Sequence, residues 1–480
     1  MTIGASPERV FHLPGLDPAD SEYSSGWYEG VTAAGLRFRS PRLTVSGAAR
    51  VADHVRAAAL EARRERSLAQ VVRALSGAAG RLVDYASDAD GGAVRTLADE
   101  LGWPEPLARE TLLEMGRVWT EEALWDVLRS ELADPDVLDG FRPAGVGRQR
   151  RAAGPPLLLQ VMAGNVPGVA VTGVMRALLC RSGVLVKLPE AEPGLVVLFA
   201  RFLAEVDSAL ASCVAAAWWP ADRDGPTWDE WTARAGTVVV YGGEKAVAGV
   251  RDRVRGHQQV LAYGPKLGVA VLLSGVDSGP AASALARDVC AYEQMGCVSP
   301  RLVLVRGSVE PFAHALGAAL AEETHRIPPP PPRADEAVAI RALRAEIEFR
   351  GYDDGGSLVI GSPEDLSWTV LIDDRPVLEF DSLPRVVRLS GFESIRQLRE
   401  ILRPLDGRIQ AIGYAGAEDR LPSLAEAAVD LGVCRMAPLG RMAWPPADWR
   451  HDGSFQLLPL LEWTEWEGGE TGAGARGRAD

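Results

Sequence analysis

The segment LLLQVMAGNVPG, residues 157–168, decides the fold class. Its first half, Leu157–Met162, has the length and apolar composition of a buried β-strand. Its second half contains the Gly, Asn and Pro residues of a turn, and the apolar pattern after Gly168 predicts a helix. A strand that turns directly into a helix is typical of an α/β protein with a parallel sheet.

Further apolar runs downstream extend this pattern. The runs of strand length are Val184–Leu188, Val214–Trp218, Thr237–Tyr241 and Gln259–Tyr263. Helix-like segments separate the first four strands of the series, which predicts a doubly wound α/β domain with right-handed crossovers. In such a sheet the loops at the carboxyl ends of the strands bind ligands.

A second series of elements surrounds one cysteine. We expect strands at Gly268–Leu273 and Arg301–Val305, with a helix from Ser278 to Gln294 between them. Cys297 therefore falls in the loop that joins this helix to the next strand.

The two ends of the chain differ from its middle. Amphipathic helices dominate upstream, for example Ala49–Ala69 and Glu121–Leu132, and a basic joint with Gly and Pro, residues 142–156, follows them. At the other end Glu467–Asp480 is Gly-rich and polar, which predicts a disordered tail.

Composition narrows the class of protein. The 480 residues are 47% hydrophobic, enough for two or three domains, and carry a formal net charge of −14 that disfavours binding to nucleic acid or an anionic membrane. The start, Met1–Gly15, lacks the pattern of a secretory signal, and no apolar run has the length of a membrane span. Five scattered cysteines indicate a reducing compartment. We expect a cytoplasmic protein.

Two common motifs carry no weight here. A GxGxxG match at Gly472–Gly477 lies in the polar tail without a strand before it, so it is no dinucleotide fingerprint. The histidines and cysteines show no metal-ligand spacing, and we expect no metal site.

Two polar side chains stand where a parallel sheet presents its ligands, and a cysteine follows a predicted helix. Asn165 and Lys187 each follow a predicted strand, and their amide and ammonium groups could polarise an oxygen or meet a ribose or phosphate. The alternatives are a helix-capping Asn and a solvated surface Lys. Cys297 follows a helix and a glycine, where backbone amides can point at its reaction centre, although an unpaired cysteine is usually a small buried apolar residue.

Taken together, these segments resemble the aldehyde dehydrogenase superfamily. The resemblance is carried, in order, by Ala163–Gly168, Lys187–Glu190, Tyr241-Gly242-Gly243, Tyr263-Gly264-Pro265-Lys266 and Gly296-Cys297. The motifs Ala-Gly-Asn-Val-Pro-Gly and Gly-Cys-Val-Ser-Pro are similar to those of LuxC-type acyl-CoA reductases. So are Pro438-Leu439-Gly440 and His451-Asp452-Gly453, which lie nearer the C-terminus.

This resemblance implies an aldehyde dehydrogenase-like α/β fold with a nicotinamide cofactor. The implied regions are a helical N-terminal part packed on the cofactor domain (residues 1–150), a Rossmann-type cofactor domain (151–263), a catalytic domain (264–420), a segment returning to the core (421–466) and the tail (467–480). A homo-oligomer is also suggested.

The resemblance also assigns roles to residues. It makes Cys297 the covalent nucleophile and Asn165 a side-chain donor to the oxyanion. Lys187 and Glu190 would approach the adenosine ribose. The turn at Gly242-Gly243 would lie near the pyrophosphate.

One departure from the superfamily pattern concerns the reaction. With Gly264 and Lys266 aligned, the glutamate that activates water in hydrolytic members falls on Ala262, which cannot act as a base. An acyl group that is exchanged with a thiol needs no such base, so the pattern favours thioester chemistry.

We therefore expect reduction of an acyl-CoA, or a related acyl thioester, to an aldehyde through an acyl-Cys297 intermediate, with CoA as leaving group. The LuxC resemblance favours NADPH, whereas a carboxylate at Glu190 would favour NADH. Three alternatives remain open. The substrate is a carrier-protein thioester, with an acyl-transferring protein as partner; or it is an acyl phosphate; or the chain is a non-catalytic nucleotide-binding protein of the same fold.

Overall fold

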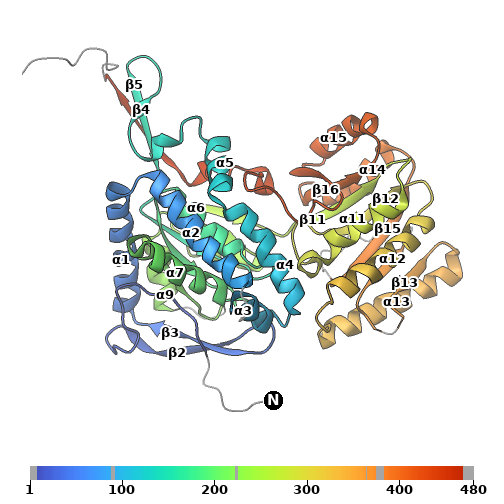
Figure 1. Cartoon of the computed structure of the whole chain (residues 1–480), viewed down its shortest axis with the longest axis horizontal. Coiled ribbons are helices and arrows are strands. Elements are labelled where there is room, and N and C mark those ends of the chain that lie inside the picture. The colour runs from blue at the N-terminus through green and yellow to red at the C-terminus, as the bar shows by residue number, and fades with distance from the viewer. Residues whose placement is uncertain (1–7, 88–91, 222–224, 364, 374–382, 469–480) are drawn as a thin grey trace, which may run out of the picture.

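The computed structural model consists of two lobes, each built on a parallel sheet (Figure 1). It describes residues 8–87, 92–221, 225–363, 365–373 and 383–468. The first lobe holds the N-terminal helices and a five-stranded sheet, and the second holds a seven-stranded sheet.

The sheet of the first lobe confirms the predicted doubly wound domain. Its strands run in the order β10-β9-β6-β7-β8 and pair in parallel throughout. The strands are β6 (Leu157–Val161), β7 (Gly183–Lys187), β8 (Val214–Ala217), β9 (Thr237–Tyr241) and β10 (Gln259–Tyr263), each within one residue of its predicted bounds. The strand order reverses between β6 and β9, so the loops after these two strands flank the crevice where ligands of such sheets bind.

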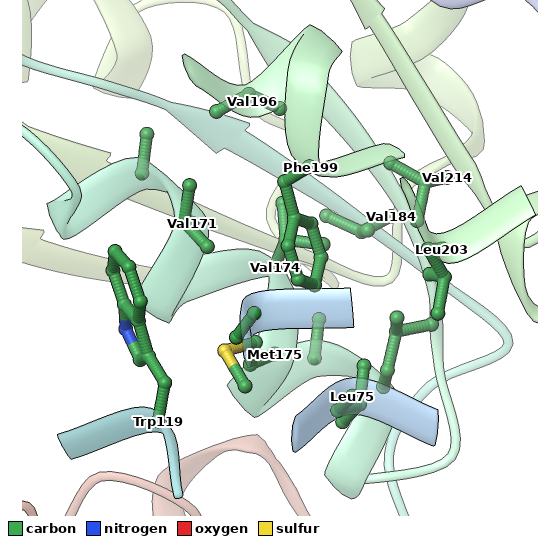
Figure 2. Packing of buried hydrophobic residues seen from close by; sticks show 14 of the residues in the cluster. Leu75, Trp119, Val171, Val174, Met175, Val184, Val196, Phe199, Leu203 and Val214 are labelled. Carbon is green, nitrogen blue, oxygen red and sulfur yellow. The ribbon is translucent and has the colours of Figure 1, made fainter. Parts of the chain in front are cut away.

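Helices cover both faces of this sheet. They are α6 (Val169–Leu179), α7 (Gly194–Val206), α8 (Ser208–Ala211), α9 (Pro226–Arg234) and α10 (Glu244–Arg251). On one face, Val174 and Phe199 from α6 and α7 pack with Val184 and Val214 of the sheet (Figure 2). On the other, α9 contributes Trp231 to a separate core. A buried layer on each side explains why these strands are almost wholly apolar.

The N-terminal region is mainly helical but begins with strands. The strands are β1 (Glu8–Arg9), β2 (Ser24–Val31) and β3 (Arg37–Leu43), and the helices are α1 (Val45–Glu65), α2 (Leu68–Ser87), α3 (Gly92–Leu101), α4 (Glu105–Gly116) and α5 (Glu121–Glu131). The expected single helix Ala49–Ala69 is wrong, because the chain breaks at Arg66. The Asp139 carboxylate accepts a hydrogen bond from the Leu68 N–H at 2.8 Å and so starts a new helix.

The second lobe follows the same plan. Its strands run in the order β13-β14-β15-β12-β11-β16-β17, and β13 is antiparallel to β14. The strands are β11 (Leu267–Leu272), β12 (Pro300–Arg306), β13 (Leu358–Gly361), β14 (Thr369–Ile372), β15 (Val386–Phe392), β16 (Ile409–Ala415) and β17 (Arg435–Pro438). The helices are α11 (Ser278–Cys290), α12 (Glu310–Arg326), α13 (Ala334–Asp354), α14 (Ile395–Leu402) and α15 (Leu421–Asp430).

After β17 the chain returns to the first lobe, and we call residues 439–461 the crossing segment (Figure 1). Buried carboxylates hold both ends of it. Asp288 accepts hydrogen bonds from the N–H groups of Gly440 and Met442, and Glu131 accepts them from Gln456 and Leu457. The crossing segment is therefore fixed to both lobes.

The chain then ends its described part in a small antiparallel sheet. Strand β18 (Glu462–Glu467) pairs with β5 (Arg148–Ala153), which also pairs with β4 (Arg142–Pro143). The first residue of the predicted tail thus belongs to a strand, and the tail from residue 469 onward lies outside the described residues.

Candidate active site

The loop before Cys297 has an unusual backbone. The helix expected to reach Gln294 ends at Cys290, because Tyr292, Glu293 and Gln294 all have φ between 53° and 62°. Three successive non-glycine residues in this left-handed region are strained, and such strain persists only where the surroundings enforce it. The loop is therefore held in place from outside.

Two buried side chains hold the loop. The Glu293 carboxylate pairs with the guanidinium of Arg385, with Nη2 2.5 Å from Oε1, and both side chains are almost fully buried. The Gln294 amide donates to the carbonyl oxygens of Pro300 and Val386 at 2.6 and 3.0 Å. These contacts tie the cysteine loop to the start of β15.

Cys297 is half-buried at the end of this loop. Burial, and then the carboxylate of Asp452, raise the pKa of its thiol to about 12. Cys180, Cys213 and Cys290 are buried in the hydrophobic cores, as expected for structural cysteines.

Asn165, in the loop after β6, lies beside the cysteine loop, as the family resemblance implies. Its Nδ2 donates a hydrogen bond to the carbonyl of Met295 at 2.9 Å. An amide nitrogen carries two N–H bonds, and the Met295 carbonyl takes one of them. The structure therefore places the predicted oxyanion donor against the loop that carries the predicted nucleophile.

His451 is a site residue to which sequence reasoning gave no role. The crossing segment carries its imidazole into the site, where Nε2 lies 3.8 Å from the Cys297 Sγ. Aromatic rings surround it, with centroids at 4.9 Å for Tyr263, 5.0 Å for Trp449 and 5.9 Å for Tyr241. The sequence feature that could have identified His451 is the His451-Asp452-Gly453 motif, which contributes above to the family resemblance alone.

A cavity of about 570 Å³ opens onto Cys297 and His451. Its walls come from α4, α5, α6 and the crossing segment, and most of the lining is apolar. Representative lining residues are Met115, Trp119, Val127, Met175, Val298 and Trp444. The cavity suits an extended apolar chain with its reacting end at the thiol.

The predicted cofactor residues lie at the carboxyl edge of the first sheet. Lys187 ends β7, its Nζ lies 5.5 Å from the ring centroid of Trp219, and burial lowers its pKa to about 8. Glu190 lies in the loop that follows. Gly242 and Gly243 join β9 to α10, and a Cβ on Gly243 would meet no atom within 4 Å. These four residues form a group separate from the contacts around Cys297.

Two kinds of feature, a metal cluster and a membrane-spanning helix, are absent from the residues that the structure describes. Within them, no group of three or more His, Cys, Asp and Glu side chains is placed to hold a metal ion. Nor is any helix there long and apolar enough to cross a membrane.

Solved structures with the same architecture are aldehyde dehydrogenases. Aldehyde dehydrogenase 21 from Physcomitrella patens, in complex with the product succinate, superposes with a TM-score of 0.71 over 98% of this chain and 100% of that one, at 14% identity. A mutant of aldehyde dehydrogenase C from Pseudomonas syringae, solved with NAD+ and octanal, gives 0.71 over 96% of each chain at 13% identity. The fold is that of the aldehyde dehydrogenases.

Sequence comparisons show which family within this fold the chain belongs to. The model of the acyl-CoA reductase (LuxC) family matches residues 64–463, so the chain belongs to that family. A long-chain acyl-protein thioester reductase from Vibrio harveyi is 26% identical over 292 residues, which span 60% of each protein. The predicted family and fold are confirmed.

Proposed function

We propose that this protein reduces a long-chain acyl thioester to an aldehyde, with Cys297 as the covalent nucleophile. The observation that carries the proposal is the Cys297 thiol at the inner surface of a mostly apolar cavity of about 570 Å³. Burying each CH₂ group of an acyl chain there contributes about 0.8 kcal/mol to binding. The thiol then attacks the thioester carbonyl, and the bond to the donor sulfur breaks.

Asn165 and the backbone N–H of Cys297 hold the oxyanion in this proposal. The Asn165 Nδ2 is fixed beside the cysteine loop by its bond to Met295, so its second N–H is oriented before substrate arrives. Preorganised donors of this kind stabilise charge that develops in the transition state. The acyl-enzyme forms by expulsion of the donor thiol.

A nicotinamide cofactor fits the carboxyl edge of the first sheet. When bound, it supplies the hydride that reduces the acyl carbon. The buried Lys187 ammonium and the Glu190 carboxylate would hold the adenosine ribose, and the open space over Gly243 leaves room for a pyrophosphate. We assign NADPH as the preferred cofactor, with NADH as the alternative.

The absence of a base at Ala262 supports a thioester rather than a free acid as the partner of the aldehyde. Ala262 lies in β10, half-buried against the Trp231 core. CoA is the donor that we propose. The Vibrio harveyi relative is described as acting on an acyl-protein thioester, which makes a protein-bound thioester the other donor to test.

The experiment is a substrate panel with both reduced cofactors. Acyl-CoAs of increasing length and an acylated carrier protein are supplied separately, and absorbance at 340 nm is followed together with thiol release. We expect equal amounts of oxidised cofactor, free thiol and aldehyde, with rates that increase with acyl length. Cofactor oxidation without thiol release, or no turnover with any thioester, would refute the proposal.

Asn165→Ala is expected to lower kcat by about 10²-fold, because one oxyanion donor is lost. The KM for the thioester changes little, since the donor acts mainly in the transition state. Steady-state kinetics measure both constants. Asn165 is exposed, so the melting temperature stays close to that of the wild type. An effect confined to KM would contradict the assigned role.

Lys187→Ala is expected to raise the cofactor KM more than it lowers kcat, because a ribose contact contributes mostly uniform binding. Since burial lowers the pKa of Lys187 to about 8, cofactor affinity of the wild type also weakens as the pH rises through 8 and the ammonium loses its proton. Arg396→Ala, which removes an exposed cation on α14 of the second lobe, is the control. Equal effects of the two variants would remove Lys187 from the cofactor site.

A further inference from the structure

His451 has a second partner besides Cys297. Its Nδ1 lies 3.5 Å from Oδ1 of Asp452, just beyond the usual hydrogen-bond range of about 2.7–3.2 Å. Both atoms are buried, and within the described residues neither has a hydrogen-bond partner. Buried polar atoms without partners are costly, so a small closing movement that joins these two atoms is favourable.

This arrangement fixes the tautomer of the imidazole. A carboxylate beside Nδ1 favours the proton on that nitrogen, which leaves the Nε2 lone pair directed at the Cys297 sulfur. Lys266 also faces Asp452, with its Nζ 3.9 Å from Oδ1. The backbone of Asp452 has φ +54°, a strained conformation of the kind that clusters at functional sites.

We propose that His451, oriented by Asp452, accepts the proton of the Cys297 thiol and delivers it to the departing thiol of the substrate. The inference rests on the proposed function and adds the residue that moves its protons. As the bond from Sγ to the acyl carbon forms, the thiol proton passes to Nε2. When the bond between the acyl carbon and the donor sulfur breaks, that proton passes to the donor sulfur.

The second half of the reaction balances in the same way. After reduction of the acyl group, the anion of the Cys297 thiohemiacetal re-forms the C=O bond, breaks its C–S bond, releases the aldehyde and leaves a Cys297 thiolate. This thiolate takes up one proton from solvent through His451. One proton is therefore consumed in each turnover, as the conversion of thioester and reduced cofactor to aldehyde, thiol and oxidised cofactor requires.

The surroundings keep both groups neutral at rest. Burial, and then the charges of Arg176 and Lys266, lower the pKa of His451 to about 3. The thiol, with a pKa of about 12, does not ionise by itself near neutral pH. The titratable and charged groups around the pair are Asp452, Lys266, Arg176, Arg301, Tyr241 and Tyr263. His451 is thus in its base form throughout the working pH range, and because it is a weak base the thiol proton passes to Nε2 in concert with bond formation at Sγ.

The test is the rate at which iodoacetamide alkylates Cys297, followed from pH 6 to 9 by mass spectrometry of the peptide. In the wild type we expect a nearly constant rate. In His451→Ala we expect a loss of about 10²-fold at pH 7, within the range for general-base help, and a tenfold rise per pH unit because only spontaneous thiolate then reacts. Added imidazole restores part of the rate.

Two variants complete the design. His12→Ala removes another histidine whose pKa burial lowers, on the far side of the first lobe from Cys297, and should react like the wild type. His451→Gln keeps a polar side chain of similar size and gives the answer should the alanine variant fold poorly. A flat pH profile at the wild-type rate in both His451 variants would overturn the proposal.

Alkylation needs neither thioester nor cofactor, so the two proposals fail separately. Dependence of alkylation on His451 without any thioester reduction would retain the thiol–imidazole pair and refute the reductase. Thioester reduction that survives in His451→Ala with an unchanged pH profile would retain the reductase and refute the role of His451.

Discussion

Cys297→Ala is expected to lower aldehyde formation from acyl thioesters by about four orders of magnitude or more, because no acyl-enzyme forms without the nucleophile. Cofactor binding stays close to that of the wild type, since the group around Lys187 is separate from the cysteine loop. Stopped thioester reactions analysed by mass spectrometry should show an acyl adduct on the Cys297 peptide of the wild type and none in the variant.

The control for this prediction is Cys290→Ala, seven residues earlier in the chain. Cys290 lies in the core of the second lobe, and its loss should cost stability while turnover per folded molecule is retained. Retained turnover in Cys297→Ala would end the covalent mechanism.

Arg385→Met is expected to lower the free energy of unfolding by about 3–5 kcal/mol, because it leaves the Glu293 carboxylate buried without its partner. The loss should also reduce kcat, since the pair holds the strained backbone that leads to Cys297. Urea unfolding followed by tryptophan fluorescence measures the first effect, and steady-state kinetics the second.

Two comparisons isolate the buried charge. Arg396→Met breaks an exposed pair with Glu400 on α14 and should cost no more than about 1 kcal/mol. The double variant Glu293→Gln/Arg385→Met removes both charges and should recover part of the lost stability. A double variant that is no more stable than Arg385→Met would mean that the unpaired charge is not the cause.

Much of the fold is determined by short stretches of sequence. The strands of the first lobe are apolar runs bounded by Gly, Pro and polar residues, so their positions could be predicted from sequence within a residue. The break between α1 and α2 could not, because the carboxylate that caps Leu68 belongs to Asp139, 71 residues away. The end of α11 depends in the same way on Arg385, 92 residues from Glu293.

The residues of the candidate site likewise differ in how far their positions could be predicted from sequence. Cys297 and Asn165 each follow a predicted element, and the family resemblance, not topology, implied that they share one site. His451 lies 154 residues after Cys297 in a segment of turns and short 3-10 helices, and no periodicity places its ring. Only the three-dimensional course of the crossing segment brings the imidazole to the sulfur.

The crossing segment also sets the order in which the protein becomes reactive. Its anchor on Glu131 joins residues up to 327 positions apart, so this contact forms only when nearly the whole described chain is available. A nascent chain that has completed both sheets but not this segment exposes Cys297 as an ordinary thiol without its imidazole. In the proposed mechanism, chemical competence therefore arrives last, when the crossing segment joins the two lobes.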